Sequence, residues 1–281
     1  MVARAARGML EQLVARDTLA RLVDDVAPTG ARVMPLKGIL LVALGIRSAS
    51  ERPMIDVDVL VDPDRARAAV AAVRARGWEV RLGNATACML VHPRTSSTSV
   101  DLHRALFPPH TYRMAAEAVL ARGTPDVRLF GRQISRMSGL DLYAHLVGHF
   151  TKGRSDGRDL RLLRDFAPAG RASGATPAEH ARHLEALGLG RAARYALGLA
   201  VERERDGFAA EVLAALRPDR RGQILARVAR RALARVTPGS QWGIPFVHSL
   251  NATLGQGARS LAANLTDPIR RGGPPEAWWR P

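Results

Sequence analysis

Two aspartates lie two positions apart in a segment rich in β-branched residues, Ile55-Asp-Val-Asp-Val-Leu-Val61. Side chains alternate between the two faces of a strand, so Asp56 and Asp58 would project together from one side. Carboxylates held side by side lose hydration and raise one another's pKa unless a cation compensates for both. Oxygen ligands of this kind favour Mg²⁺ or Mn²⁺. The pair therefore predicts a divalent metal site, with a solvated turn or strand edge as the alternative for an isolated Asp-x-Asp.

A third aspartate repeats the pattern further along the chain. Asp101 lies in a second expected strand, residues 98–106, in which Ser99, Asp101 and His103 share one face. If the two strands are neighbours, three carboxylates converge. Three acidic ligands can hold one metal ion or a close pair, which polarises a phosphoryl group and activates an attacking oxygen. The chemistry indicated is phosphoryl or nucleotidyl transfer.

Lysine is rare in this basic chain, which makes Lys37 informative. The formal net charge is +16, but of the 42 basic residues only Lys37 and Lys152 are lysines. An arginine and alanine bias of this kind is typical of a GC-rich coding sequence, so the charge alone does not indicate a nucleic-acid partner. A lysine in such a background indicates a site that needs a compact ammonium, such as a phosphate contact.

The elements that must position these residues follow from hydrophobic periodicity. Helical spacing predicts a helix over residues 2–26, and residues 31–46 predict a strand, a tight turn at Lys37-Gly38 and a helix. Strands are expected at 55–61, 78–82, 88–92 and 98–106, helices at 63–76 and 114–121, and a hairpin strand at 127–134. Together these elements predict a small mixed sheet.

From residue 139 onward only helical periodicity is present, so the fold class is α/β (α+β), with a second domain that is helical. Helices are expected at 140–150, 160–166, 178–187, 192–201 and 208–216. The predicted organisation is a mixed-sheet domain at 1–136, a helical domain at 137–270 and a Gly- and Pro-rich tail at 271–281. Trp278 and Trp279 are candidate anchors of that tail.

Two features of the helical region have structural interpretations. A helix expected at 217–236 carries four arginines along one side, and a solvated face is favoured there over a contact with RNA or lipid. Those arginines are Arg220, Arg227, Arg231 and Arg235. His145 and His149 share a helical face without the glutamate of a zinc protease between them, so they are interpreted as structural or substrate-lining.

The sequence also excludes some classes of protein. The longest apolar run, residues 38–46, is shorter than the roughly 18 to 20 residues that cross a membrane, so no span is predicted. The first helix carries charges throughout, unlike a secretion signal, and a cytoplasmic location is expected. The single cysteine, Cys88, excludes a disulfide framework and a multi-thiolate zinc site, and is expected to be a small buried residue.

Three motifs occur in a characteristic order: Leu36-Lys-Gly38, then Arg52-Pro-Met-Ile-Asp-Val-Asp-Val-Leu-Val61, then Val100-Asp-Leu-His103. In this order the chain resembles the uncharacterised nucleotidyltransferase family of the DNA polymerase β superfamily. The segment from Asp141-Leu-Tyr-Ala-His145 to Asp165 resembles the histidine-bearing and following helices of that family. The resemblance covers about residues 30–166. Gly45-Ile46 and Ile55 depart from the family pattern, which leaves the base and sugar contacts open.

The resemblance implies a role for each matching residue. Asp56 and Asp58 would ligate Mg²⁺ or Mn²⁺ and Asp101 would complete the site, with general-base catalysis as a further role left open. Lys37 and Gly38 would form a phosphate-binding turn, in which glycine admits the backbone to the triphosphate. Arg52 would be a phosphate contact or a plain surface arginine. His103 would be a substrate contact, an orienter of Asp101 or a structural histidine.

The function expected is that of a bacterial-type nucleotidyltransferase, which moves a nucleoside monophosphate from an NTP donor to an acceptor and releases pyrophosphate. A peptide, protein or small-molecule acceptor is expected by analogy with the family. One alternative is an RNA- or tRNA-directed transferase of toxin type, and another is a non-catalytic nucleotide-binding or assembly module. The base preference, the number of metal ions and the oligomeric state stay open.

Overall fold

The computed structural model describes residues 2–54, 56–84, 86–95, 97–108, 110–152, 160–233 and 258. These residues form two compact units. The first contains the described residues up to Leu106 together with Ala115–Ser138. The second contains Phe107–Met114 together with the described residues from Gly139 onward.

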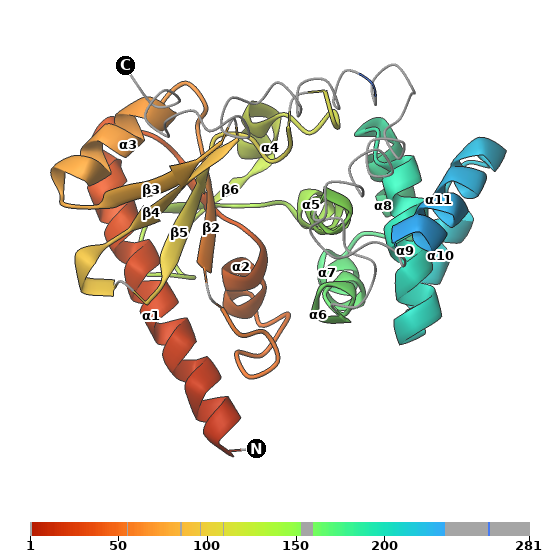
Figure 1. The fold of residues 1–281 in the computed structure, drawn as a ribbon, viewed down its shortest axis with the longest axis horizontal. Coiled ribbons are helices and arrows are strands. Elements are labelled where there is room, and N and C mark those ends of the chain that lie inside the picture. Colours follow the sequence, from red (N-terminus) through yellow and green to blue (C-terminus); the bar gives the residue numbers. More distant parts are fainter. Residues whose placement is uncertain are drawn as a thin grey trace. The chain divides into compact units, whose positions relative to one another are not determined.

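A five-stranded sheet lies at the centre of the first unit (Figure 1). Its strands are β1 Val33–Pro35, β2 Asp56–Val61, β3 Glu79–Gly83, β4 Ala87–Val91 and β5 Ser99–His103. They lie in the order β1-β2-β5-β4-β3, with β2 and β5 parallel and each other neighbouring pair antiparallel. The predicted mixed sheet is confirmed. The two strands that carry the paired aspartates and Asp101 are direct neighbours.

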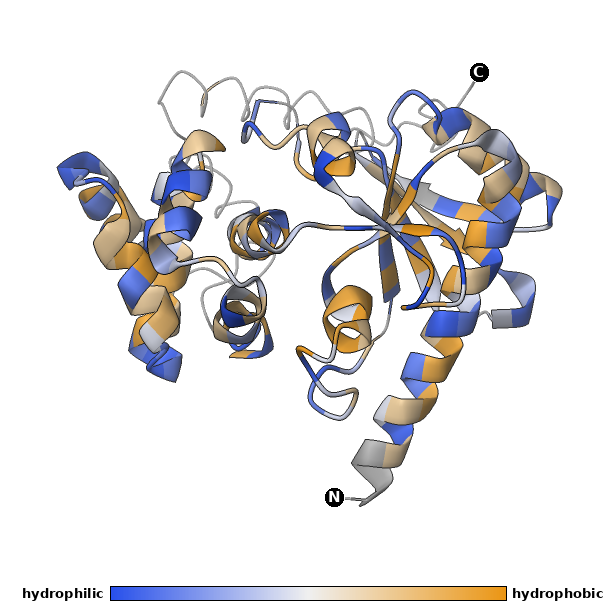
Figure 2. Cartoon of the chain, turned by 180° about the vertical axis from the view of Figure 1, so that it is seen from behind, coloured by the Kyte–Doolittle hydropathy of each residue, from blue (hydrophilic) through white to orange (hydrophobic). Residues whose placement is uncertain are grey.

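Two helices of the first unit share a hydrophobic core with one face of this sheet. The first unit contains α1 Val2–Val26, α2 Lys37–Ala43, α3 Ala66–Ala75, α4 Ala116–Arg122, the 3-10 turns η1 Ala27–Thr29 and η2 Pro93–Thr95, and a hairpin of β6 Thr124–Asp126 and β7 Ile134–Arg136. Leu22 of α1 and Val70 of α3 share one hydrophobic core with Val57 and Val59 of β2. Figure 2 shows hydrophobic and hydrophilic residues alternating along α1, as this packing requires. The intervening residues of β2 therefore face the other side of the sheet.

The helix expected from residue 63 begins three residues later, at Ala66. A turn precedes it, in which the backbone N–H of Arg65 donates to the carbonyl of Asp62 at 3.1 Å. The proline after Asp62 therefore lies in the turn and does not open the helix. The sequence rule that favours proline in a first helical turn placed this boundary too early.

The strand expected at residues 127–134 is wrong. That segment connects β6 to β7, and strand pairing begins again only at Ile134. The carboxylate of Asp126 accepts hydrogen bonds from the backbone N–H groups of Arg128 at 2.8 Å and Leu129 at 3.1 Å. An aspartate that bonds its own following backbone turns the chain, which overrides the extended preference of the apolar residues nearby.

The second unit is helical, as predicted. Its helices are α5 Gly139–Lys152, α6 Leu160–Leu163, α7 Phe166–Ala172, α8 Pro177–Ala186, α9 Gly190–Glu204, α10 Gly207–Ala215 and α11 Arg220–Leu233. Local capping fixes two starts: Thr176 and Glu179 form a capping box at α8, and the Asp206 carboxylate accepts from the Ala209 N–H at 2.9 Å at α10. The single helix expected at 160–166 is instead divided between α6 and α7.

The segment Phe107–Met114 belongs with the helices rather than with the sheet that precedes it. The Arg113 N–H donates to the Leu187 carbonyl at 2.8 Å, and the Phe107 ring lies against that of His145 with centroids 5.8 Å apart. The domain boundaries drawn from the sequence, 1–136 and 137–270, stay predictions.

Among the described residues no helix is both long and apolar enough to cross a membrane. The arginine-rich helix is described as α11, which ends at Leu233. The predictions for Arg235, for the 271–281 tail and for Trp278 and Trp279 lie outside the described residues.

Candidate metal and phosphate site

The register between β2 and β5 brings two carboxylates face to face. Asp58 is the direct partner of Asp101, and Asp56 is the partner of Ser99. Residues opposite one another on neighbouring strands project from the same side, away from the core that contains Val57 and Val59. Asp58 is buried, Asp101 is partly buried and Asp56 is exposed at the first position of β2. The three predicted acidic residues therefore share one face of the sheet.

Asp58, Asp101 and His103 form a compact group of metal-ligand type. Each offers one ligand atom, and these atoms all lie within 4.8 Å of one another. His103 also donates through Nε2 to Oδ1 of Asp58 at 3.1 Å. Two carboxylate oxygens on neighbouring strands fit a hard divalent cation such as Mg²⁺, which accepts further oxygens from a substrate phosphate. Asp56, two positions before Asp58 on the same face, is outside this group and could complete it.

Lys37 reaches into the same group. Its Nζ lies 2.5 Å from Oδ1 of Asp58, and both side chains are buried. The sequence predicted a phosphate contact for this lysine. In the structure its ammonium pairs with a predicted metal ligand, and the phosphate contact stays a prediction.

The pKa values of the paired carboxylates Asp56 and Asp58 shift in opposite directions. Burial opposes ionisation of Asp58, but the hydrogen bond from His103 and the charge of Lys37 hold its pKa far below the usual range. Desolvation and then the charge of Asp58 raise the pKa of Asp56, and Asp101 adds to that rise. Asp58 thus has the closer cationic partners, whereas Asp56 meets two negative neighbours whose effect on its pKa the charge of Lys37 offsets only in part. The negative charge of Asp56 and Asp101 on this face of the sheet would therefore stabilise one more bound cation.

The turn at Lys37-Gly38 has a conformation that the sequence did not indicate. Lys37 has φ of +47°, in the left-handed region, whereas Gly38 does not have a positive φ. A Cβ on Gly38 would lie 3.6 Å from Cγ of Met54 and 3.9 Å from Cζ of Arg52, which are ordinary contacts. The strained residue of the turn is therefore the lysine, and glycine is not required there by the packing of the protein alone.

Backbone bonds connect this turn to the strand that carries the carboxylates. The N–H of Leu36 donates to the carbonyl of Asp58 at 2.9 Å, immediately before the turn. The N–H of Arg52 donates to the Ser48 carbonyl at 3.0 Å and holds the loop that leads into β2. The Arg52 guanidinium thus lies beside Gly38, where the resemblance places a phosphate contact.

All seven predicted site residues thus lie on the first unit, in two adjoining groups. The strand group contains Asp56, Asp58, Asp101 and His103, and the turn group contains Lys37, Gly38 and Arg52. What sequence reasoning missed is the ion pair that joins the groups. Its only signal was the rarity of lysine, which marks the residue but not its partner.

Two other sequence interpretations can be placed. Cys88 is buried, as expected, and burial together with the charge of Asp101 raises the pKa of its thiol to about 12. His145 and His149 are neighbours on α5, with ring centroids 6.0 Å apart, and His145 packs against Phe107. Among the described residues they do not form a ligand group of the kind made by Asp58 and Asp101.

Comparison with known proteins gives one family. A family model described as an uncharacterised nucleotidyltransferase matches residues 3–203, more than half of the 281-residue chain. Among solved structures, the antibiotic-resistance factor ANT(2″)-Ia is similar with a TM-score of 0.40 and 17% identity, over 67% of this chain and 97% of that one. No curated protein matches. The family match confirms the resemblance carried by the motifs, and it ends before α10.

Proposed function

The chain belongs to the uncharacterised nucleotidyltransferase family, and from this premise we propose that it moves a nucleoside monophosphate from an NTP to a peptide, protein or small-molecule acceptor. The acceptor oxygen or nitrogen forms a bond to the α-phosphorus, the bond from that phosphorus to the bridging oxygen breaks, and pyrophosphate leaves. The single observation that carries the proposal is the register of Asp58 against Asp101 on neighbouring parallel strands.

In this proposal Asp56, Asp58 and Asp101 hold Mg²⁺ or Mn²⁺. When bound, such an ion neutralises phosphate charge and polarises the phosphoryl group that is transferred. His103 keeps Asp58 oriented through the 3.1 Å hydrogen bond from Nε2. Asp101, which lies opposite Asp58 in the sheet, would accept the proton that the acceptor loses.

The turn group would bind the triphosphate. Lys37 begins α2 and its ammonium contacts Asp58, so that ammonium and the first backbone N–H groups of the helix would bind phosphate oxygens. Arg52, against Gly38, would add a planar guanidinium that can bond two phosphate oxygens at once. With a divalent ion bound to Asp58, the Lys37 ammonium would release that carboxylate and bind a phosphate oxygen of the NTP. It would then stabilise the negative charge of the leaving pyrophosphate.

The test is the thermal stability of the protein with each of the four NTPs, with and without Mg²⁺. A ligand at 100 times its Kd stabilises the folded protein by about 2.7 kcal/mol, which is readily measured. We expect a magnesium-dependent shift in wild type that Asp58→Asn abolishes. Asp64→Asn is the matched control, because this aspartate is exposed in the turn after β2 and should keep the shift.

Each variant is compared with its own nucleotide-free baseline, because Asp58→Asn also removes the partner of Lys37. A shift of equal size in wild type and Asp58→Asn would show that the nucleotide binds elsewhere. No shift with any NTP would overturn the donor site as proposed. A positive result then identifies the base, and release of pyrophosphate with candidate acceptors can be assayed with that NTP.

A further inference from the structure

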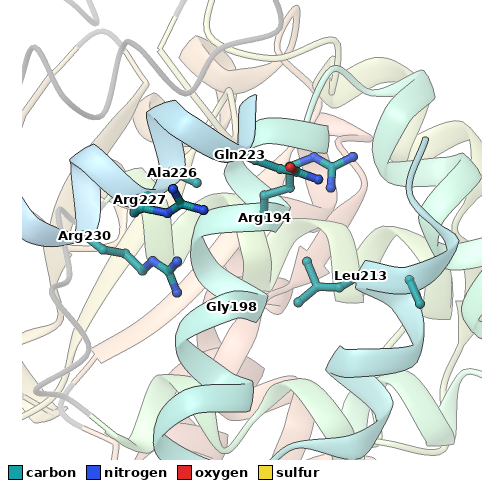
Figure 3. Close-up of a pocket in the computed structure, with 8 residues that line it drawn as sticks. Arg194, Gly198, Leu213, Gln223, Ala226, Arg227 and Arg230 are labelled. Atoms are coloured by element: carbon teal, nitrogen blue, oxygen red, sulfur yellow. The ribbon is translucent and has the colours of Figure 1, made fainter. Parts of the chain in front are cut away.

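A second pocket lies wholly within the helical unit, between α9, α10 and α11 (Figure 3). Its volume is about 360 Å³, within the usual range for small-molecule sites. The residues that matter most are three arginines, a glutamine, a glycine and a leucine: Arg194, Arg227, Arg230, Gln223, Gly198 and Leu213. In Figure 3 Arg227 and Arg230 extend from α11 toward α9, and Arg194 lies beside Gln223.

The pocket carries positive charge that the described residues compensate only in part. None of its lining residues is acidic within the described chain. Arg230 has one carboxylate partner, Glu202, at 3.4 Å, in a pair exposed enough to contribute little. Arg194 donates a hydrogen bond to the backbone carbonyl oxygen of Arg217. This uncharged acceptor does not neutralise the guanidinium. For Arg227, which is exposed, no ion pair is present among the described residues.

Small residues on α9 and α11 let the pocket arginines come close to one another. Ala226 and Ala229 are buried on the inner side of α11, and such small side chains let that helix lie close to α9. Gly198 leaves the surface of α9 open: a Cβ there would lie 3.3 Å from Nη1 of Arg230, closer than a side chain comfortably tolerates. The guanidinium of Arg230 thus lies against α9 at a position that has no side chain.

We propose that this pocket binds a compact ligand bearing a phosphate or diphosphate group. Guanidinium groups bond two phosphate oxygens in a planar fork, and arginines on two different helices could engage one anion from two sides. A pocket of about 360 Å³ bounded by three helices has the size for a small anion, whereas a polymer backbone needs a continuous track. The inference does not depend on the proposed transferase reaction, since α10 and α11 lie beyond the residues that match the family.

The test is isothermal titration of the whole protein with inorganic diphosphate in EDTA, which removes divalent ions from the catalytic carboxylates. We expect binding in wild type and at least tenfold weaker binding in Arg227→Gln/Arg230→Gln, a change of about 1.4 kcal/mol. The matched control is Arg182→Gln/Arg221→Gln. It removes the same charge from two exposed positions of the helical unit that do not line the pocket, and it should leave the affinity within twofold.

A steric variant separates a built site from general attraction. Gly198→Leu fills the pocket without changing charge, and it should weaken diphosphate binding as strongly as the double arginine variant while the far-ultraviolet circular dichroism is unchanged. Titrations with inorganic phosphate and glycerol 3-phosphate distinguish a free inorganic anion from an organic phosphate as the natural ligand.

Four results would overturn the proposal. One is the absence of diphosphate binding in wild type, and another is equal loss in the pocket and control variants, which would indicate only general charge attraction. The third is tight binding of a short single-stranded RNA that both double variants weaken equally, because the exposed arginines of the helical unit would then form a nucleic-acid surface. Binding that survives in Gly198→Leu would likewise place the anion outside this pocket.

Discussion

The ammonium of Lys37 and the carboxylate of Asp58 form a buried ion pair, with Nζ 2.5 Å from Oδ1. Asp58 is also the residue opposite Asp101 in the sheet. The lysine therefore occupies one oxygen of a carboxylate that the proposed function assigns to a divalent ion. A cation that enters the site must displace this ammonium or share its oxygen, so lysine and metal compete for the same charge.

The first prediction is that Lys37→Ala binds Mn²⁺ more tightly than wild type in the absence of nucleotide, by about fivefold or more. Removing a competitor worth about 1 kcal/mol gives a change of this size. Electron paramagnetic resonance of free Mn²⁺ measures the affinity directly. Lys37→Arg is the control, because it keeps a cation beside Asp58 and should not gain affinity. Weaker Mn²⁺ binding in Lys37→Ala would show that the lysine assists the metal instead of competing with it.

The second prediction concerns the backbone of the same residue. Lys37 has φ of +47°, which costs a residue with a Cβ roughly 1 kcal/mol and costs glycine little. Lys37→Ala and Lys37→Gly both lose the ion pair and should both be less stable than wild type. The glycine variant should nevertheless be more stable than the alanine variant by about 0.5 to 1 kcal/mol in urea denaturation. The reverse order would mean that residue 37 is not left-handed in solution.

Much of the strand group could be predicted from the sequence because alternation is a local rule. Asp56 and Asp58 must share a face in any strand, and so must Asp101 and His103. That these two faces coincide depends on the pairing of β2 with β5, which local pattern leaves open and which the family resemblance supplied.

Other features depended on tertiary contacts and were missed. The partner of Lys37 is 21 positions away and is chosen by the fold. The hairpin at β6 and β7 was misplaced because one aspartate bonds its own following backbone. The pocket arginines come from α9 and α11, and no sequence period connects Arg194 with Arg230.

The third prediction is a pH dependence of stability at the end of β2. Asp62 is buried and accepts hydrogen bonds from Arg32, through the backbone N–H at 2.6 Å and through Nη2 at 2.5 Å. Burial opposes ionisation, but these bonds lower the pKa of Asp62 below its ordinary value of 3.8. A lowered pKa stabilises the folded state above the unfolded value, and that stabilisation is lost as the pH falls through the folded value.

Asp62→Asn should therefore cost about 1 to 2 kcal/mol at pH 7, a range reduced because the Arg32 side chain is nearly half exposed. The difference from wild type should persist to about pH 5 and shrink below about pH 4. Urea denaturation at pH 7, 5 and 3 measures it, with Asp64→Asn as the exposed neighbour that should change little. A deficit of constant size at all three pH values would exclude the ionised carboxylate as its source.

The fourth prediction tests the packing of the helical unit. A Cβ on Gly170 of α7 would overlap the ring of Phe208, whose atoms Cε1, Cδ1 and Cζ are its nearest neighbours. Phe208 in turn packs against Tyr143 and His180, with ring centroids 5.8 Å and 5.4 Å away, so the ring has little freedom to move. Gly170→Ala should therefore destabilise the protein by about 1 to 3 kcal/mol, the usual cost of overpacking a core.

The matched control is Gly207→Ala, because a Cβ there meets nothing within 4 Å and the residue begins α10 without a positive φ. Alanine at this position should leave stability unchanged or raise it by up to about 1 kcal/mol, through helix propensity. Thermal denaturation of both variants, followed at 222 nm, makes the comparison. Equal stability of Gly170→Ala and Gly207→Ala would mean that α7 and α10 are not in close contact at Phe208, and the close packing of these helices described above would be wrong.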